Sequence, residues 1–417
     1  MTAGRIVVDG GSYRVTATLR LRRHPCALPR GFMPLLLLLS AATFVVGIGA
    51  FAVIGVISPL SRDLGLTPVG ASWVMSSYAL AYAVGSPLLT SATGRFDRRT
   101  VLILGMALFG LGVLASALAT NPTLLYAGRV VTALGAGLYS PTAAGVAIAS
   151  VPIERRGQAL SIVYAGLTLA QVAGVPAGGY LGYLLGWSQV FWIVAALAAA
   201  MTLALALRVP RAIDVAPARL SDLVSTLVNP RLAGAVLLTA SVMCAGWIPY
   251  TFLAPIIEEK TGGGPEVVAL LLVVYGFGSV AGNLLGGVLT DRVGPNRALL
   301  VATVLPVPMM AAVTLIPWHQ VWLGGLLLFA WASVGWAISV PQQARLVALD
   351  PARTQVLLSL SAACIYIGAS VGSLVAGFAK SMGGIPAIGI AAILAGLIGI
   401  AHLALTLSRE QRQAATT

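Results

Sequence analysis

One arginine lies where charged side chains are rarest in this sequence. Arg129 stands inside the apolar segment 125–137, whereas the twelve acidic residues fall at the ends of apolar segments, between them or near the termini. An arginine in the middle of a membrane costs on the order of 3 kcal/mol, so Arg129 is expected to face a wet cavity. Because two like charges repel when they are desolvated together, such a cavity without an opposing acid favours neutral or anionic ligands over cations.

Residue types that could bind a metal or carry out catalysis form no cluster. No glycine-rich phosphate loop, Ser/His/Asp set or pair of carboxylates occurs at a usable spacing. The cysteines and histidines are too scattered to make a ligand set: Cys26, Cys244, Cys364, His24, His319 and His402. We therefore expect no enzyme, no metal site and no cofactor.

The composition excludes an ordinary soluble protein. Of 417 residues, 58% are apolar and 9% are charged, against about 25% charged in a typical soluble domain. Eight uncharged runs are each long enough for one membrane-spanning helix: 31–61, 64–94, 100–128, 130–153, 232–257, 267–290, 354–379 and 381–408. The longer runs 157–207 and 298–344 each hold two, broken at 186–187 and at 317–319. The sequence predicts an all-α integral membrane protein with twelve transmembrane helices.

The basic residues indicate which way the helices cross the bilayer. Twenty-one arginines fall in the N-terminal arm, in alternate loops and in the C-terminal tail, and only Arg62, Lys260 and Lys380 fall on the opposite side. Positively charged loops stay in the cytoplasm, so both termini are predicted to be cytoplasmic. The basic residues are spread over short loops, so nucleic acid is not an expected partner, whereas the lipid bilayer is.

An internal repeat predicts the domain organisation. An offset of 197 residues places Tyr78 on Tyr275, Gly85 on Gly282 and Arg95 on Arg292. We therefore expect two six-helix halves in parallel register. The segments are a basic, disordered arm at 1–32, the N-terminal half at 33–207, a cytoplasmic loop at 208–231, the C-terminal half at 232–408 and a cytoplasmic tail at 409–417.

Two loops resemble the signature of the major facilitator superfamily, Gly-x-Leu-x-Asp-Arg-x-Gly-x-x-Arg. The second-half loop matches closely, whereas the first-half copy has Gly94 where the aspartate belongs and Asp97 where the glycine belongs. The residues concerned are Gly85, Arg95, Asp97, Arg98, Gly282, Gly287, Asp291, Arg292, Gly294 and Arg297. The resemblance implies twelve helices in two halves and loops that latch one conformation. The alternative for the arginines is that they only fix the orientation of the helices.

Two further segments resemble motifs of the same family. The segment around Arg129 is similar to the motif of span four, which implies a part in substrate or proton coupling. The alternative is that Arg129 snorkels towards Asn121 at the nearby interface. Span five is rich in glycine and proline and resembles the antiporter motif, which implies export rather than uptake and close helix contact where the halves meet. Its residues are Gly166, Gly174, Pro176, Gly178 and Gly179.

One branch of the family, the twelve-span drug:proton antiporters, is resembled in three segments: 58–66, 78–80 and 85–87. This branch includes arabinose-efflux and chloramphenicol-resistance permeases. The resemblance as a whole covers about residues 33–407. Relatives carry an acidic residue in span one, where this chain has Ala50. Since no carboxylate lies in mid-membrane, the candidates for proton coupling are Arg129, Asp63 and Asp291. An uncoupled facilitator is the alternative.

Spans one, four, seven and ten line the central site in this fold, so they supply the expected substrate cavity. Its candidate residues are Thr43, Phe51, Arg129, Thr132, Met243, Trp247, Tyr250, Trp336 and Gln342. The resemblance implies a proton-coupled exporter in a bacterial inner membrane. Arg129 without an opposing acid indicates small neutral or anionic amphiphiles as its substrates, and we expect a monomer. Uptake or facilitated diffusion of a sugar or nucleoside, and a receptor that transports nothing, remain as alternatives.

Overall fold

All regular structure in the described part of the chain is helical. The computed structural model describes residues 33–152, 155–211 and 220–414, so the predicted disordered arm at 1–32 lies outside the described residues. The N-terminal half consists of α1 (Met33–Asp63), α2 (Pro68–Ala92), α3 (Arg98–Ala117), α4 (Pro122–Ala149), α5 (Arg156–Leu169), a π-helical turn (Ala170–Gly174), α6 (Val175–Leu185) and α7 (Trp187–Arg208). The all-α prediction is confirmed.

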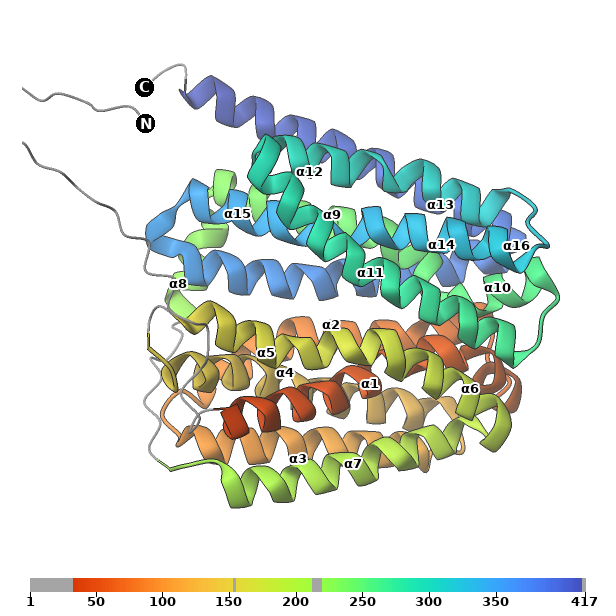
Figure 1. Ribbon diagram of the computed structural model, residues 1–417, viewed down its shortest axis with the longest axis horizontal. Helices are drawn as coiled ribbons and strands as arrows, with labels where there is room; N and C mark the ends of the chain where they lie inside the picture. Colours follow the sequence, from red (N-terminus) through yellow and green to blue (C-terminus); the bar gives the residue numbers. More distant parts are fainter. Residues whose placement is uncertain (1–32, 153–154, 212–219, 415–417) are drawn as a thin grey trace, which may run out of the picture.

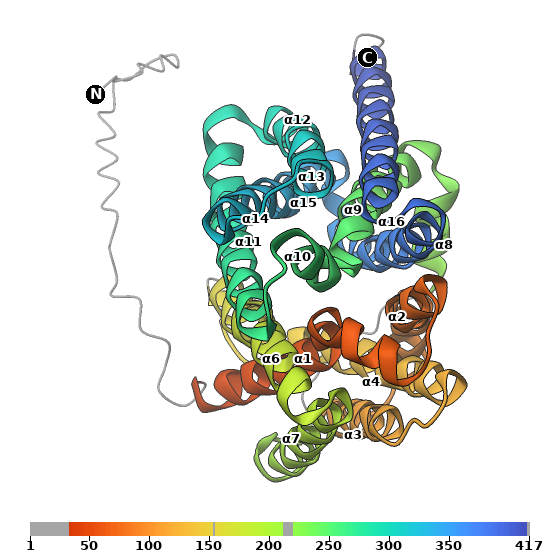
Figure 2. The same ribbon diagram turned by 90° about the vertical axis from the view of Figure 1, so that its right-hand side faces the viewer.

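The remaining helices begin with α8, which forms inside the predicted cytoplasmic loop at 208–231. They are α8 (Leu220–Val228), α9 (Pro230–Thr251), α10 (Leu253–Thr261), α11 (Pro265–Val293), α12 (Pro295–Val304), α13 (Pro306–Leu315), α14 (Val321–Trp336), α15 (Ser339–Leu349), a 3-10 turn (Pro351–Arg353) and α16 (Thr354–Ala414). Figures 1 and 2 show α1–α7 as one bundle and α9–α16 as a second bundle beside it.

Ordinary capping chemistry starts several of these helices. Thr67 caps α2 by accepting a hydrogen bond from the Gly70 amide at 3.1 Å, and Asn121 caps α4 by accepting one from the Leu124 amide at 2.9 Å. A proline follows each cap, where its missing N–H costs nothing. Because α4 begins at Pro122, Arg129 lies about two turns inside the helix.

The predicted spans correspond to the observed helices with two differences in detail. Ten helices in the described chain are long and apolar enough to cross a membrane. One of them, Val356–Glu410, contains two predicted spans joined at Gly383 and Gly384, whose backbone angles are not helical. The serine-containing α2 falls outside the ten, although its 25 residues occupy the place of the second predicted span.

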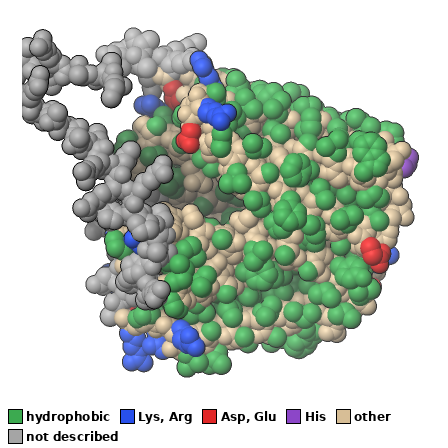
Figure 3. All heavy atoms as spheres, viewed as in Figure 1, with side chains coloured by type: hydrophobic (Ala, Val, Ile, Leu, Met, Phe, Trp, Pro, Cys, Tyr) green, Lys and Arg blue, Asp and Glu red, His purple; other side chains and the backbone are tan. Residues whose placement is uncertain are grey.

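The outer surface is that of a membrane protein. Large apolar side chains such as Leu111, Leu203 and Ile398 are more than half exposed on the flanks of the bundles. Figure 3 shows hydrophobic side chains over the middle of the molecule and charged side chains at its two ends. Only a surrounding hydrocarbon phase accommodates so much exposed apolar area.

The glycines of span five let α5 and α6 lie directly against α1. A Cβ on Gly166 would collide with the Ser40 carbonyl oxygen, and a Cβ on Gly55 would lie 2.7 Å from the Cα of Gly179. Gly174 and Gly178 also face α1, against Ile48 and Ala52. The predicted close contact is therefore real, but these glycines make it inside the N-terminal half. Between the halves it is Gly276 of α11 that packs on the backbone of Val172.

We expect Gly166→Ala to lower the melting temperature of the protein markedly, because α1 must move away to admit one methyl group. Gly157→Ala is the matched control on the same helix, since nothing lies within 4 Å of the added methyl group. That control should be neutral or stabilising by about 0.5–1 kcal/mol. Thermal unfolding in detergent measures both. Equal melting temperatures for the two variants would contradict the packing described here.

Candidate functional site

An apolar cavity lies inside the C-terminal half. It encloses about 50 Å³, and its described lining contains aromatic, aliphatic and small residues with no charged side chain. Four residues of the predicted cavity meet here: Met243, Trp247 and Tyr250 of α9 with Trp336 of α14. Drug-sized ligands occupy roughly 300–1,000 Å³, so a ligand must displace side chains to enter. Unbranched methionines such as Met243 can give way in this manner.

A chain of aromatic rings runs from the N-terminal half into this cavity. Phe51 of α1 lies 6.2 Å from Trp247, which meets Tyr250 edge to face at 5.1 Å. Tyr250 stacks on Tyr275 of α11 at 5.0 Å, and Tyr275 meets Trp331 of α14 at 5.2 Å. Such offset and edge-to-face geometries are the favourable ones for aromatic pairs. Rings arranged in this way can also bind flat apolar groups of a ligand, and they offer no counter-charge to an ion.

The polar atoms at the cavity are few. The Trp336 indole nitrogen donates to the Tyr275 hydroxyl at 3.3 Å. Thr303 of α12 also lines the space. A few polar groups in an apolar pocket fix the orientation of a ligand, while the apolar surface supplies the affinity. The arrangement therefore fits a neutral, partly aromatic ligand.

Arg129 lies elsewhere, entirely buried between α4, α1 and α2. Its guanidinium donates to the carbonyl oxygens of Gly49 at 2.5 Å, Ala50 at 3.0 Å and Val74 at 3.2 Å. It also lies over the Tyr78 ring, 4.5 Å from the centroid. Since Arg129 has no exposed surface, the expectation that it faces a wet cavity is wrong for this conformation. Backbone carbonyls and an aromatic ring take the place of the missing acid.

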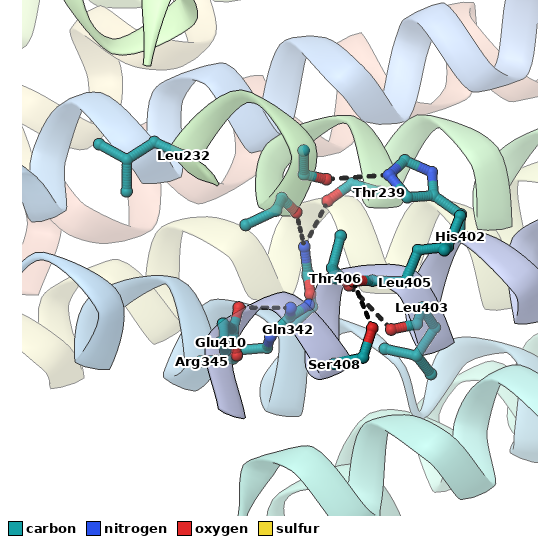
Figure 4. A network of polar contacts seen from close by, with 12 residues as sticks. Leu232, Thr239, Gln342, Arg345, His402, Leu403, Leu405, Thr406, Ser408 and Glu410 are labelled. Atoms are coloured by element: carbon teal, nitrogen blue, oxygen red, sulfur yellow. Dashed lines mark hydrogen bonds and ion pairs between the residues drawn. The ribbon is translucent and has the colours of Figure 1, made fainter. Parts of the chain in front are cut away.

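The other polar cavity candidates make structural contacts. Thr43 and Thr132 donate to carbonyls of their own helices, those of Leu39 and Gly128, both at 2.8 Å. Gln342 of α15 donates to the Ala235 carbonyl at 2.8 Å and to Thr239 at 3.0 Å. Figure 4 shows Gln342 in a polar network that joins α9, α15 and α16. None of the three lines the apolar cavity.

The same network contains Arg345, one of the arginines that the sequence places in the loops between spans. Arg345 is 2% exposed within α15, and its guanidinium pairs with the Glu410 carboxylate at 2.7 Å (Figure 4). Glu410 belongs to α16, which continues to Ala414 into the predicted cytoplasmic tail. The pair therefore ties the end of α15 to the end of the chain's last helix.

The two halves touch at one end of the molecule, which we call the closed end and define by Asp63, Gly186, Thr261 and Met382. Towards this end Ser76 of α2 bonds to Ser370 of α16, with hydroxyl oxygens 2.7 Å apart. Deeper in the bundle the rings of Tyr82 and Tyr366 stack at 3.8 Å across the same pair of helices. Figure 3 shows a hollow between the halves near the opposite end, where α16 ends.

The predicted latch loops lie at that opposite, open end. The side chains of three loop residues are exposed: Asp291, Arg292 and Arg297. Among the described residues, the Asp291 carboxylate has no hydrogen-bond or ion-pair partner. Gly294 has a φ of +83°, which explains glycine there. Arg98 is buried and donates to the Gly94 carbonyl at 3.2 Å. The remaining loop residues differ in setting: Gly85 meets the Leu134 side chain, Gly282 meets the Ser333 backbone, Gly287 faces open space, and Arg95 and Asp97 are exposed.

The coupling candidate Asp63 lies at the closed end within the N-terminal half. Its carboxylate accepts a hydrogen bond from the Trp187 indole at 3.0 Å. A different acid, Glu258 of α10, reaches across to the other half and accepts a hydrogen bond from the Ser58 hydroxyl of α1 at 3.0 Å. Sequence reasoning did not single out Glu258. It also missed Tyr275 and Trp331 as cavity residues, although Tyr275 was already marked by the internal repeat.

Comparison with known proteins agrees with this architecture. The model of the Major Facilitator Superfamily matches residues 39–353 and 235–417. The chloramphenicol resistance protein of Streptomyces lividans is 33% identical over 351 residues, covering 82% of this chain and 88% of the relative. The inner membrane transport protein YdhP of Escherichia coli is 29% identical over 366 residues, with 87% and 93% covered.

Solved structures share the fold at low sequence identity. A bacterial homologue of the human lysosomal transporter Spinster, in an inward-facing and unoccupied conformation, has a TM-score of 0.71 at 17% identity, with 91% of this chain and 96% of that one covered. The nucleoside transporter NupG has a TM-score of 0.73 at 14% identity, with 90% and 98% covered.

Proposed function

Because this chain belongs to the Major Facilitator Superfamily, we propose that it is a secondary transporter that exports small, neutral, partly aromatic compounds by alternating access, in exchange for protons. The family and the multi-pass membrane fold are its premises. The substrate class, the direction of transport and the coupling ion are the proposal.

The apolar cavity is the observation that carries the substrate class. Five aromatic residues present ring faces and edges to this cavity: Trp247, Tyr250, Tyr275, Trp331 and Trp336. No charged side chain lines the described space. A permanent cation would be desolvated without a counter-charge, which is costly. An anion would fare no better, because the guanidinium of Arg129 is engaged with backbone carbonyls. The substrate expected from the sequence, neutral or anionic, is therefore narrowed to a neutral one.

The direction of transport rests on relatives and on the motif of span five. One relative is named a chloramphenicol resistance protein, and resistance to a drug fits its removal from the cell. The glycines of span five, with their resemblance to the antiporter motif, favour export as well. The predicted topology puts the closed end outside and the open end in the cytoplasm. An exporter in this conformation would collect its substrate from the cytoplasm or the inner leaflet.

Accumulation of radiolabelled compounds in a pump-deficient bacterial host tests the proposal. We expect cells that express the protein to accumulate less chloramphenicol, a neutral aromatic compound, than cells with the empty vector. A protonophore should abolish the difference. A permanent aromatic cation and an aromatic carboxylate of similar size are the charged comparisons, and neither should be depleted. Cells that retain more of the neutral compound, or that export only the cation, would refute the proposal.

A further inference from the structure

A polar cavity lies between the two halves at the closed end. It has a volume of about 490 Å³ and is lined from the N-terminal half by Ser58, Ser61 and Arg62, and from the C-terminal half by Glu258, Glu259 and Lys380 among others. The Ser58 hydroxyl donates to Oε2 of Glu258 across this boundary at 3.0 Å. Any opening of this end must break that bond, so Glu258 is placed where it senses the separation of the halves.

One oxygen of the Glu258 carboxylate is poorly solvated. Oε1 is buried and has no hydrogen-bond partner among the described residues. An ionised oxygen that is buried without a hydrogen-bond donor loses its hydration, and no hydrogen bond compensates for that loss. The neutral acid does not pay this penalty, and its O–H can donate. Closure of this end therefore favours the protonated form of Glu258.

Charges on the neighbouring helices act in the opposite sense. Arg62 of α1 and Lys380 of α16 both favour the carboxylate, as does the Ser58 hydroxyl. The Lys380 ammonium lies 4.6 Å from the centroid of the Phe252 ring. Other charged groups nearby are Glu259 and Lys260 on α10 itself, Asp63 at the end of α1 and Glu266 at the start of α11, while α14 carries none. The titratable His319, just before α14, lies 3.0 Å from the Lys260 carbonyl oxygen through its Nδ1. Burial outweighs the favourable contacts and raises the pKa of Glu258 above its ordinary value.

We propose that Glu258 is a proton-binding site of the transporter, which takes up a proton from the outside when the two halves separate at this end and whose protonation then favours closure. This inference rests on the proposed transport function. The step forms one O–H bond on the carboxylate and consumes one proton from the external water. In the open form the same carboxyl would face water, where a glutamate has its ordinary affinity for protons.

The sign of the linkage fits an exporter driven by protons. A group that binds its proton more tightly in the closed form stabilises that form as the pH falls. Acid outside the cell would then close the outer end and return the emptied carrier to the form that is open to the cytoplasm. A base outside would favour the outward-open form. This step covers the return of the emptied carrier with a proton bound from outside, which is one half of the exchange.

Distances between spin labels across the closed end test the inference without any substrate. Labels at Thr120→Cys and Met382→Cys, both at exposed positions, are placed in a chain whose native cysteines are replaced by serine. Electron resonance distances are then measured in lipid nanodiscs from about pH 4 to pH 8, so that the series starts near the ordinary pKa of glutamate and extends well above it. We expect the short, closed distance to gain population as the pH falls.

Three variants make the test specific. Glu258→Gln, a neutral mimic of the protonated acid, should stay closed over the whole range and lose the pH dependence. Glu258→Asp, whose shorter side chain no longer reaches Ser58, should keep a pH dependence, because a carboxyl group that binds a proton remains at this end. Glu259→Gln changes a neighbouring exposed acid of the same cavity and should keep the midpoint of the parent protein.

A Glu258→Gln protein that opens and closes with the parent midpoint would overturn the inference, and so would a parent protein whose distances ignore pH. The result is separable from the proposed function. A parent protein that closes with falling pH through Glu258, yet exports none of the test compounds, would overturn the export proposal and support the proton site.

Discussion

Arg129→Lys is expected to destabilise the protein more than Arg129→Met. Lysine keeps a buried positive charge but cannot reach the carbonyls of Gly49, Ala50 and Val74 together, because its ammonium is a single point and not a planar fork. A buried charge that loses its partners costs about 3–5 kcal/mol. Methionine removes the charge, and the three carbonyls lie within α1 and α2, where helical amides can still bond to them.

Thermal unfolding of the purified variants in detergent measures this order. Arg208→Lys and Arg208→Met are the matched control pair, since Arg208 is exposed at the end of α7 and both changes should leave the melting temperature unaltered. A Lys variant of Arg129 that is as stable as the parent would contradict this account, in which the buried guanidinium holds α1 and α2 together. A Met variant that is less stable than the Lys variant would contradict it as well.

The same pair of variants separates two roles in transport. If the charge of Arg129 served the substrate or the proton, lysine would retain transport and methionine would lose it. If Arg129 holds α1 and α2 together through its fork, as the contacts indicate, lysine should be at least as damaging to transport as methionine. α1 and α2 carry Ser58 and Ser76 to the other half, so loss of these contacts would disturb the closed end.

Trp331→Ala is expected to reduce efflux of a neutral aromatic substrate at least about tenfold, which corresponds to about 1.4 kcal/mol. The indole lies 2% exposed against Tyr275 and forms one wall of the apolar cavity. Its removal takes away one of the two indole surfaces that α14 offers there. Trp331→Phe keeps an aromatic face and should keep a larger share of the activity.

Trp322→Ala is the matched control on the same helix. Trp322 is 71% exposed on the outer surface, so its loss should leave efflux near the parent level. Efflux rates are compared at equal amounts of monodisperse protein in the membrane, which removes any difference in folding. A Trp331→Ala protein with parental efflux, or equal losses in both variants, would place the substrate outside this cavity.

The span pattern was predictable because charge and turn residues mark the boundaries of membrane helices. The breaks at Gly186 and at Pro317 appear where the sequence predicts them, with Gly186 at a φ of +94° between α6 and α7. Arg129 was correctly placed inside a span, since it interrupts an apolar run. Its partners were not predictable. A sequence does not show which backbone carbonyls a side chain will contact. Because no carboxylate was available to pair with Arg129, the sequence analysis expected water in a cavity around it.

The site was only partly predictable because apolar helices do not show which face turns inward. α14 is apolar nearly all round, so nothing in its pattern separates Trp331, which is buried, from Trp322, which faces out. Gln342 was expected in the cavity for its polarity but faces Ala235 and Thr239 instead. Glu258 sits at the end of a predicted span, and only the short helix α10 brings it against Ser58.

Uptake by purified protein in liposomes is the most direct test of the central claim, that the apolar cavity carries neutral compounds across the membrane in exchange for protons. Liposomes with an acidic interior are diluted into a neutral buffer that contains radiolabelled chloramphenicol. We expect the compound to accumulate inside above its outside concentration, and we expect Trp331→Ala to abolish the accumulation while Trp322→Ala does not. Accumulation no greater than in protein-free liposomes, or accumulation of a permanent cation alone, would contradict the account.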